Sequence, residues 1–187
     1  MDDSGHGYAD TYNFSLTTFS PNGKLMQIEH ALNAIAAGAT SVGIKARDGI
    51  VLAVDKNLPP MYIGESIPKI NRICDSVGLV SSGMGPDARV LVKRARKEGQ
   101  KYWLTYQEEI NCTMTTRRLA TLMQEYTQRG GVRPFGVSLL VAGFDGDVPE
   151  LFQVDPSGSF WPWKATALGK NMTSVKVFLE KRSAPPP

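Results

Sequence analysis

Few residues of this chain have the types and spacing that catalysis requires. Only two of its 187 residues are histidines, His6 and His30, so a Ser-His-Asp triad would need one of them as its base. His6 falls in a polar stretch that we expect to be disordered and His30 at a helix start, which argues against a triad. The sequence also contains no GxSxG elbow, P-loop or HExxH motif. We therefore expect no catalytic residues of these classes, no metal site and no cofactor.

The cysteines and the composition indicate an ordinary globular protein. Cys74 and Cys112 lack the spacing of a metal or redox site, and we interpret them as reduced, mostly buried thiols of a cytosolic or nuclear protein. Hydrophobic residues make up 42% and charged residues 21%, and the net charge of +3 is too small to indicate a nucleic-acid-binding protein. The acidic, polar first residues exclude a secretory signal, and no apolar run approaches the length of a membrane-spanning helix.

Three short stretches allow two interpretations each. The basic run KRARK at residues 93–97 suits a nuclear import or nucleic-acid patch, but we favour the solvated side of a helix. Trp161-Pro162-Trp163 could stack on a base or a peptide, although alternating large residues more often pack in a core or an interface. Residues 83–85 could hold an anion at a helix start, but no lysine stands at P-loop spacing, so we favour a tight strand-to-helix turn.

The clearest structural signal in the sequence is a helix followed directly by a β-hairpin. Residues 19–37 carry apolar side chains at three- and four-residue spacing, which predicts a helix that begins in a Pro-Asn-Gly turn. Gly38 is expected to end this helix in the left-handed conformation. The pattern then changes to that of a hairpin, with strands around residues 42–44 and 50–54 and a turn at Asp48-Gly49.

The rest of the chain alternates between predicted strands and helices. Residues 56–66 are expected to form a loop because they contain two prolines and a glycine. Pro86 and Asp87 suit the first turn of a long helix, and Asn111 or Thr113 is expected to cap a second one. Further strands are predicted at residues 67–74, 76–82, 137–144, 150–154 and 159–166, and a last helix at 171–182. This order indicates an α+β sandwich of two sheets with helices outside.

Five long segments of the chain resemble alpha-type subunits of the 20S proteasome, and one type of these subunits most of all. The segments are TTFSPNGKLMQIEHAL, SSGMGPDARVLVKRARK, MQEYTQRGGVRPFGVSLLVAG, LFQVDPSGSF and ATALGKN. The resemblance implies the Ntn-hydrolase αββα sandwich, in which two antiparallel sheets lie between helical layers, with an extra N-terminal helix. It divides the chain into a disordered tail (residues 1–11), an alpha-type domain (residues 12–182) and a Pro-rich end (residues 183–187).

The resemblance also implies that the protein is not catalytic. Catalytic beta subunits of this superfamily expose an N-terminal threonine at the start of the first strand, and its free amine serves as the base. Ala39 stands at that position here and has no hydroxyl. The supporting carboxylate and lysine match Asp55 and Lys69, and for Asp55 we favour a structural hydrogen bond. An autonomous Ntn-type amidohydrolase would require a cut that exposes Thr40 or Ser41.

Two binding roles follow from the resemblance. Lys69 is expected to pair with the C-terminal carboxylate of a regulatory particle in a pocket between adjacent subunits, with Gly83 and Met84 near the same pocket. Pore gating in alpha subunits uses a cluster of a tyrosine, an acid, a proline and a second tyrosine. Tyr12 and Pro21 match this pattern, whereas Asn13 and His30 replace the acid and the second tyrosine.

The resemblance implies a multi-subunit setting. The expected partners are other alpha subunits in a seven-membered ring, beta-ring subunits, the C-termini of regulatory particles and assembly chaperones, in the cytoplasm and the nucleus. We expect neither a nucleic acid nor a membrane as a partner. Family members continue beyond a segment like FLEKR with further helices and strands, so a C-terminal truncation is expected, and a chain that binds alpha subunits or chaperones without entering the ring is a further alternative.

Overall fold

The computed structural model describes residues 18–183, and this part of the chain forms a layered α+β sandwich. Its helices are α2 (Met26–Ala36), α3 (Gly85–Tyr106), α4 (Cys112–Gln128) and α5 (Met172–Ser183), with a short 3-10 turn η1 (Gly64–Ser66). Its strands are β1 (Ser41–Lys45), β2 (Ile50–Val54), β3 (Ile70–Arg72), β4 (Val77–Gly83), β5 (Val137–Asp145), β6 (Val148–Val154), β7 (Phe160–Pro162) and β8 (Ala165–Leu168).

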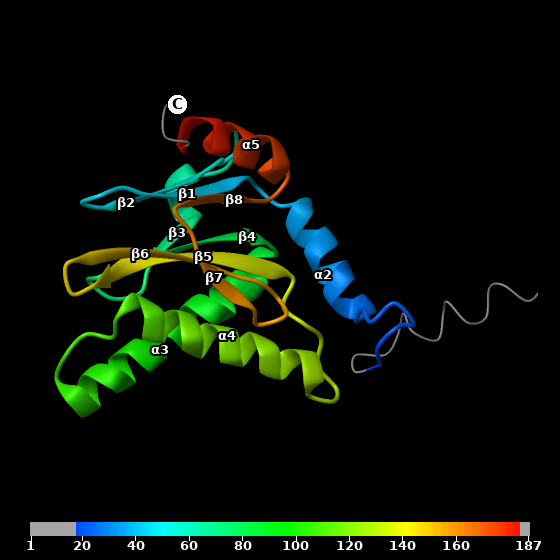
Figure 1. Cartoon of the computed structure of the whole chain (residues 1–187), viewed down its shortest axis with the longest axis horizontal. Coiled ribbons are helices and arrows are strands. Elements are labelled where there is room, and N and C mark those ends of the chain that lie inside the picture. Colours follow the sequence, from blue (N-terminus) through cyan, green and yellow to red (C-terminus); the bar gives the residue numbers. More distant parts are fainter. Residues whose placement is uncertain (1–17, 184–187) are drawn as a thin grey trace, which may run out of the picture.

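The strands form two antiparallel sheets that lie face to face. One sheet has three strands in the order β2-β1-β8, and the other has five in the order β3-β4-β5-β6-β7. Helix α5 lies outside the three-stranded sheet, α3 and α4 lie outside the five-stranded sheet, and α2 stands at one end of the sandwich (Figure 1). The predicted αββα arrangement with an additional N-terminal helix is confirmed.

Two apolar clusters hold the layers together. The larger one lies between the five-stranded sheet and helices α3 and α4, and it includes Leu79, Leu91, Met123 and Val141. The smaller one lies between the two sheets, and its buried members are Val80, Leu140, Ala142, Leu151 and Leu168. The five-stranded sheet therefore buries apolar side chains on both of its faces and lies at the centre of the core.

The predicted turns and caps around these elements are largely confirmed. The Gly23 amide donates to the Ser20 carbonyl over 2.8 Å, and Gly23 has a φ of +72°, as the Pro-Asn-Gly turn requires. Lys45 and Ile50 form the last pair of the first hairpin. The side chain of Asn111 accepts a hydrogen bond from the Met114 amide over 2.8 Å and so caps α4.

Two predictions about the N-terminal helix are wrong. The helix begins at Met26 rather than at residue 19, because the turn that contains Gly23 separates the preceding residues from it. Gly38 does not adopt the left-handed conformation, and the helix ends at Ala36 with Ala37 as a right-handed C-cap. Glycine is required at position 38 for a different reason. A Cβ atom there would lie 2.5 Å from the Gly83 nitrogen and 2.8 Å from Ser82 Oγ.

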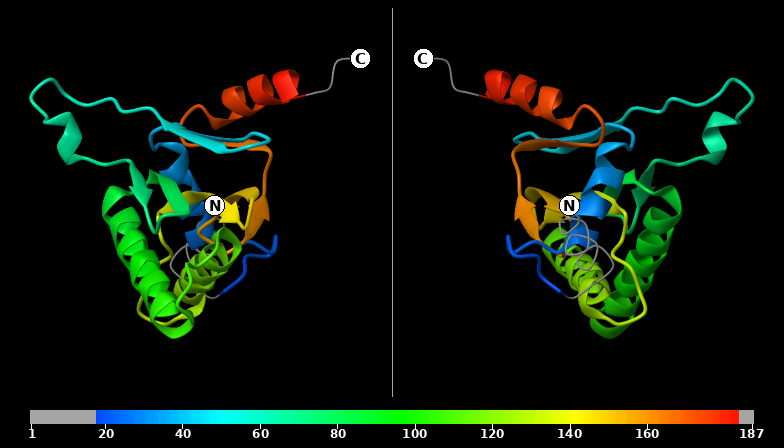
Figure 2. Two further views of the ribbon diagram at one scale, coloured as in Figure 1. Left: turned by 90° about the vertical axis from the view of Figure 1, so that its left-hand side faces the viewer. Right: turned by 90° about the vertical axis from the view of Figure 1, so that its right-hand side faces the viewer.

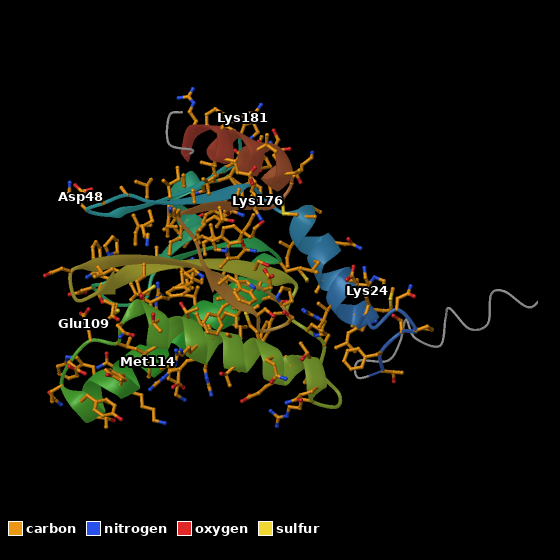
Figure 3. The ribbon with its side chains drawn as sticks, viewed as in Figure 1. Lys24, Asp48, Glu109, Met114, Lys176 and Lys181 are labelled. Carbon is orange, nitrogen blue, oxygen red and sulfur yellow. The ribbon has the colours of Figure 1, made fainter. Side chains whose placement is uncertain are left out.

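The predicted single strand at residues 159–166 is also wrong. The chain changes sheet at Trp163 and Lys164, so that β7 pairs with β6 and β8 pairs with β1. The Trp163 amide donates to the Leu151 carbonyl of one sheet, while the Lys164 carbonyl accepts from Lys45 of the other, both over 2.8 Å. Trp163 packs against the cluster between the sheets, and the ammonium of Lys176 lies 5.2 Å from the centre of the Trp163 ring. Lys176 belongs to α5, the helix outside the three-stranded sheet (Figure 3).

Candidate functional site

The junction between α2 and β1 is held by three consecutive hydrogen bonds to main-chain carbonyls. The Lys170 amide donates to Gly38 over 3.0 Å, and the Asp55 amide donates to Thr40 over 2.8 Å. Between them, the Ser82 hydroxyl donates to the Ala39 carbonyl over 2.7 Å. The donors come from the residues just before α5, just after β2 and near the end of β4. The junction, residues 37–40 between α2 and β1, is therefore fixed from three sides (Figure 1).

The hydroxyl groups next to Ala39 are not placed for nucleophilic attack. Ser41 is fully buried, and its backbone pairs with Val54 on one side and Leu168 on the other. Its hydroxyl lies 3.5 Å from the Ser81 carbonyl. Thr40 is half-buried and its carbonyl is bonded to Asp55. In the uncut chain neither residue has the free amine that an N-terminal nucleophile uses as its base.

The two predicted supports of a nucleophile do not form a pair. Asp55 is exposed and Lys69 is half-buried, and neither takes part in the ion pairs found between residues 18 and 183. Among the described residues, Asp55 bonds through its main-chain amide, which donates to Thr40, and not through its carboxylate. The structural role expected for Asp55 is therefore carried by the backbone.

Lys69 and Gly83 line the same groove. This groove has a volume of about 690 Å³ and runs between α3 and the segment that contains β3 and β4. The segment from β2 to β3 projects away from the sheets before it returns to β3 (Figure 2). Met84 is not among the residues that line the groove. Its amide donates to the Gly136 carbonyl over 2.9 Å, and a Cβ atom on Gly136 would lie 2.8 Å from Met84 Sδ.

Three further residues of the groove were not singled out as a site from the sequence. Arg89, Lys93 and Arg96 also line it. They stand at positions i, i+4 and i+7 and so share one face of α3. Part of the basic run at residues 93–97 therefore faces the groove rather than only bulk solvent. The sequence already contained the pattern that could have identified this basic face, namely cationic residues at helical spacing shortly after the Gly83–Gly85 turn.

A buried carboxylate fixes the start of α3 beside this groove. Asp87 accepts hydrogen bonds of 2.7 and 2.8 Å from Arg133, and one of 2.9 Å from the Gly136 amide. The bond from Arg133 lowers the pKa of Asp87 below its ordinary value of 3.8, although burial acts in the opposite direction. Sequence reasoning placed Asp87 only at the positive end of a helix and missed Arg133, which stands far away along the chain.

The predicted gating residues are only partly within the described residues. Pro21 and His30 are exposed, Pro21 in the turn before α2 and His30 within the helix. Tyr12 and Asn13 lie outside the described residues, as do His6 and the tail at residues 1–11. The gating cluster therefore remains a prediction.

The described residues offer little other reactive chemistry. Cys112 is buried, and this burial raises the pKa of its thiol to about 12, so that it stays protonated. Between residues 18 and 183, no three histidine, cysteine, aspartate or glutamate side chains are grouped as a metal ion would need. No helix in the same part of the chain is long and apolar enough to cross a membrane.

Comparisons with known proteins agree with the observed fold. A family model described as "Proteasome subunit" matches residues 35–186, and a model of the N-terminal signature of A-type proteasome subunits matches residues 12–34. "Proteasome subunit alpha type-2" of Dictyostelium discoideum is 61% identical over 171 residues, which are 91% of this chain and 74% of the relative. The alpha type-2-A protein of Arabidopsis thaliana is 58% identical over 172 residues (91% and 73%), and the alpha type-2 protein of Drosophila melanogaster is 57% identical over 174 residues (92% and 74%). The expectation that the chain is most similar to one alpha type agrees with these relatives.

Proposed function

The chain belongs to the proteasome subunit family, and on this premise we propose that it is a non-catalytic alpha-ring subunit of the 20S proteasome core. In this role it takes part in protein degradation by forming a seven-membered ring with other alpha subunits and by contacting the beta ring. Partner beta subunits carry the proteolytic activity. Assembly chaperones, regulatory particles and a location in the cytoplasm and the nucleus belong to the same proposal.

The observation that carries this proposal is the closed junction at Ala39. Ala39 stands where a catalytic subunit would have its threonine, and its side chain is a methyl group. Its carbonyl accepts a hydrogen bond from Ser82, and the chain runs uncut from helix α2 to this residue. Hydrolysis of the threonine type needs both a hydroxyl and a free amine at this point, and this junction supplies neither.

Exposed apolar side chains support assembly with other subunits. Met61 and Ile63, in the segment that projects between β2 and β3, are 97% and 75% exposed. A second group lies at the end of α3 and consists of Trp103, Leu104 and Tyr106. Large apolar side chains gathered in this way are typical of surfaces that another chain covers.

The groove beside Lys69 supports a docking role for regulators. Lys69 is half-buried, and an ammonium in a partly desolvated groove suits a single carboxylate. We place Gly83 in the wall of this docking site and Met84 next to it. Tyr12, Asn13, Pro21 and His30 complete the proposal as gating residues of the N-terminal region.

A tagged chain would test the proposal in cells. We expect purification through the tag to recover a particle that hydrolyses peptides. A covalent inhibitor that reacts with N-terminal threonines should label other chains of this particle and leave the tagged chain unlabelled. Recovery of an inactive chain without partners, or labelling of the tagged chain itself, would refute the proposal.

A further inference from the structure

The groove beside Lys69 collects positive charge without a negative counterpart. Arg89, Lys93 and Arg96 line it together with Lys69, and none of the described residues that line it is an aspartate or a glutamate. The three α3 side chains are exposed, and Arg96 directs its Nε to the Arg72 carbonyl over 2.8 Å. Cations that gather in one groove create a positive potential that favours an anionic ligand.

The described acidic residues on α3 and directly after β3 are engaged elsewhere. On α3, Asp87 is bonded to Arg133, and Glu98 lies 3.1 Å from Arg118. After β3, Asp75 pairs with Arg72. These three carboxylates therefore pair with arginines that do not line the groove, and they do not neutralise its cations.

The two sides of the groove differ in character. Arg89, Lys93 and Arg96 form the α3 side, whereas Asn71 and Ser81 line the opposite side on β3 and β4. Asn71 pairs with Leu79, whose side chain is buried beneath the helices, so this side of the groove is the helix-facing surface of the sheet. Neutral polar groups on this side can bond to a peptide main chain, while the α3 side attracts its charges. A volume of about 690 Å³ is also far larger than one carboxylate needs and suits several residues.

We propose that this groove selects acidic C-terminal tails. The terminal carboxylate of such a tail pairs with Lys69, and an aspartate or glutamate a few residues before the end pairs with Arg89 and Lys93. The inference rests on the proposed docking role of Lys69 and adds a second, anionic subsite that determines which tails bind.

Fluorescence anisotropy with the full chain and synthetic heptapeptides would test this inference. One peptide has a free C-terminus and two glutamates before its end, a second has glutamines instead, and a third is the glutamate peptide with an amidated end. We expect the glutamate peptide to bind about fivefold more tightly than the glutamine peptide, as for partly exposed ion pairs. The double variant Arg89→Gln, Lys93→Gln should remove this ratio and keep the preference for a free C-terminus. Lys69→Met should remove that preference.

A matched control and the contrary outcomes keep the two proposals separate. Lys97→Gln removes one positive charge from the same helix at an exposed position that does not line the groove, and it should leave the ratio unchanged. Equal affinity for the glutamate and glutamine peptides, with a retained need for the free C-terminus, would overturn the acidic subsite alone. Absence of binding by every peptide, or displacement of them all by pyrophosphate at equal concentration, would overturn the docking role as well.

Discussion

The hydroxyl of Ser82 lies 2.7 Å from the carbonyl oxygen of Ala39 and donates a hydrogen bond to it. Ser82 is buried in β4, so this bond ties the junction between α2 and β1 to the five-stranded sheet. Gly169, with a φ of +89°, closes the same site, because a Cβ atom there would lie 2.3 Å from the Ala39 oxygen. The position that the resemblance matches to the nucleophile of catalytic subunits is thus a structural contact in this chain.

Ser82→Ala should destabilise the fold. The Ala39 carbonyl would lose its donor in a partly buried place, which costs about 1 kcal/mol of unfolding free energy. Urea unfolding followed by circular dichroism measures this change. Ser174→Ala removes an exposed hydroxyl on α5 and should change stability by less than about 0.5 kcal/mol. Equal effects of the two substitutions would show that the Ser82 bond contributes nothing.

Gly38→Ala should be more harmful than the same change at Gly49. A methyl group on Gly38 would overlap with main-chain and side-chain atoms of β4, and crowding of this kind costs about 1–3 kcal/mol. Gly49 has no atom within 4 Å of an added Cβ and no positive φ, so alanine fits there. Thermal denaturation of both variants would decide the matter, and a similar melting temperature for the two would contradict the close approach.

Much of this junction could be predicted from the sequence, but the reason for Gly38 could not. The helical spacing and the Asp-Gly signal located α2 and the first hairpin because both are local patterns. The contact of Gly38 with Gly83 and Ser82 joins residues far apart in the chain, and nothing local to Gly38 distinguishes it from a helix-ending glycine.

The change of sheet at Trp163 was missed for a related reason. Residues 159–166 have the pattern of one strand, since alternation of side chains does not reveal which neighbour each residue pairs with. Likewise, the sequence shows that Arg89 and Lys93 stand at helical spacing. It does not show that they line a groove, because the groove forms only when β3 packs beside α3. The Asp87–Arg133 pair also depends on tertiary structure alone.

Ala39→Thr should not create a protease. The new hydroxyl would still follow helix α2 in a continuous chain, so no free amine would be available as its base. Intact-mass spectrometry should show an uncut chain, and a covalent inhibitor of N-terminal threonines should not label it. Cleavage after Gly38 together with labelling would show that the junction can process itself.

Asp87→Asn should weaken the fold in a pH-dependent manner. The lowered pKa of Asp87 means that its ion pair contributes stability at pH values above 3.8, and this contribution is lost as the pH falls through the lower folded-state pKa. The variant should therefore be less stable by about 2 kcal/mol near neutral pH, and the difference should shrink below about pH 4. Unfolding curves recorded across this range provide the measurement.

Asp147→Asn is the matched control for this prediction. Asp147 is exposed and takes part in none of the ion pairs among residues 18–183, so its substitution should leave stability near neutral pH unchanged. A constant difference between the wild-type chain and Asp87→Asn at every pH would contradict the role of the Arg133 pair.

Native mass spectrometry of this chain, produced together with other alpha-type subunits, tests the central claim most directly. The account predicts a seven-membered ring that contains one copy of the chain in its uncut form. Rings that form without it, while the chain stays free or aggregates, would contradict its role as an alpha-ring subunit.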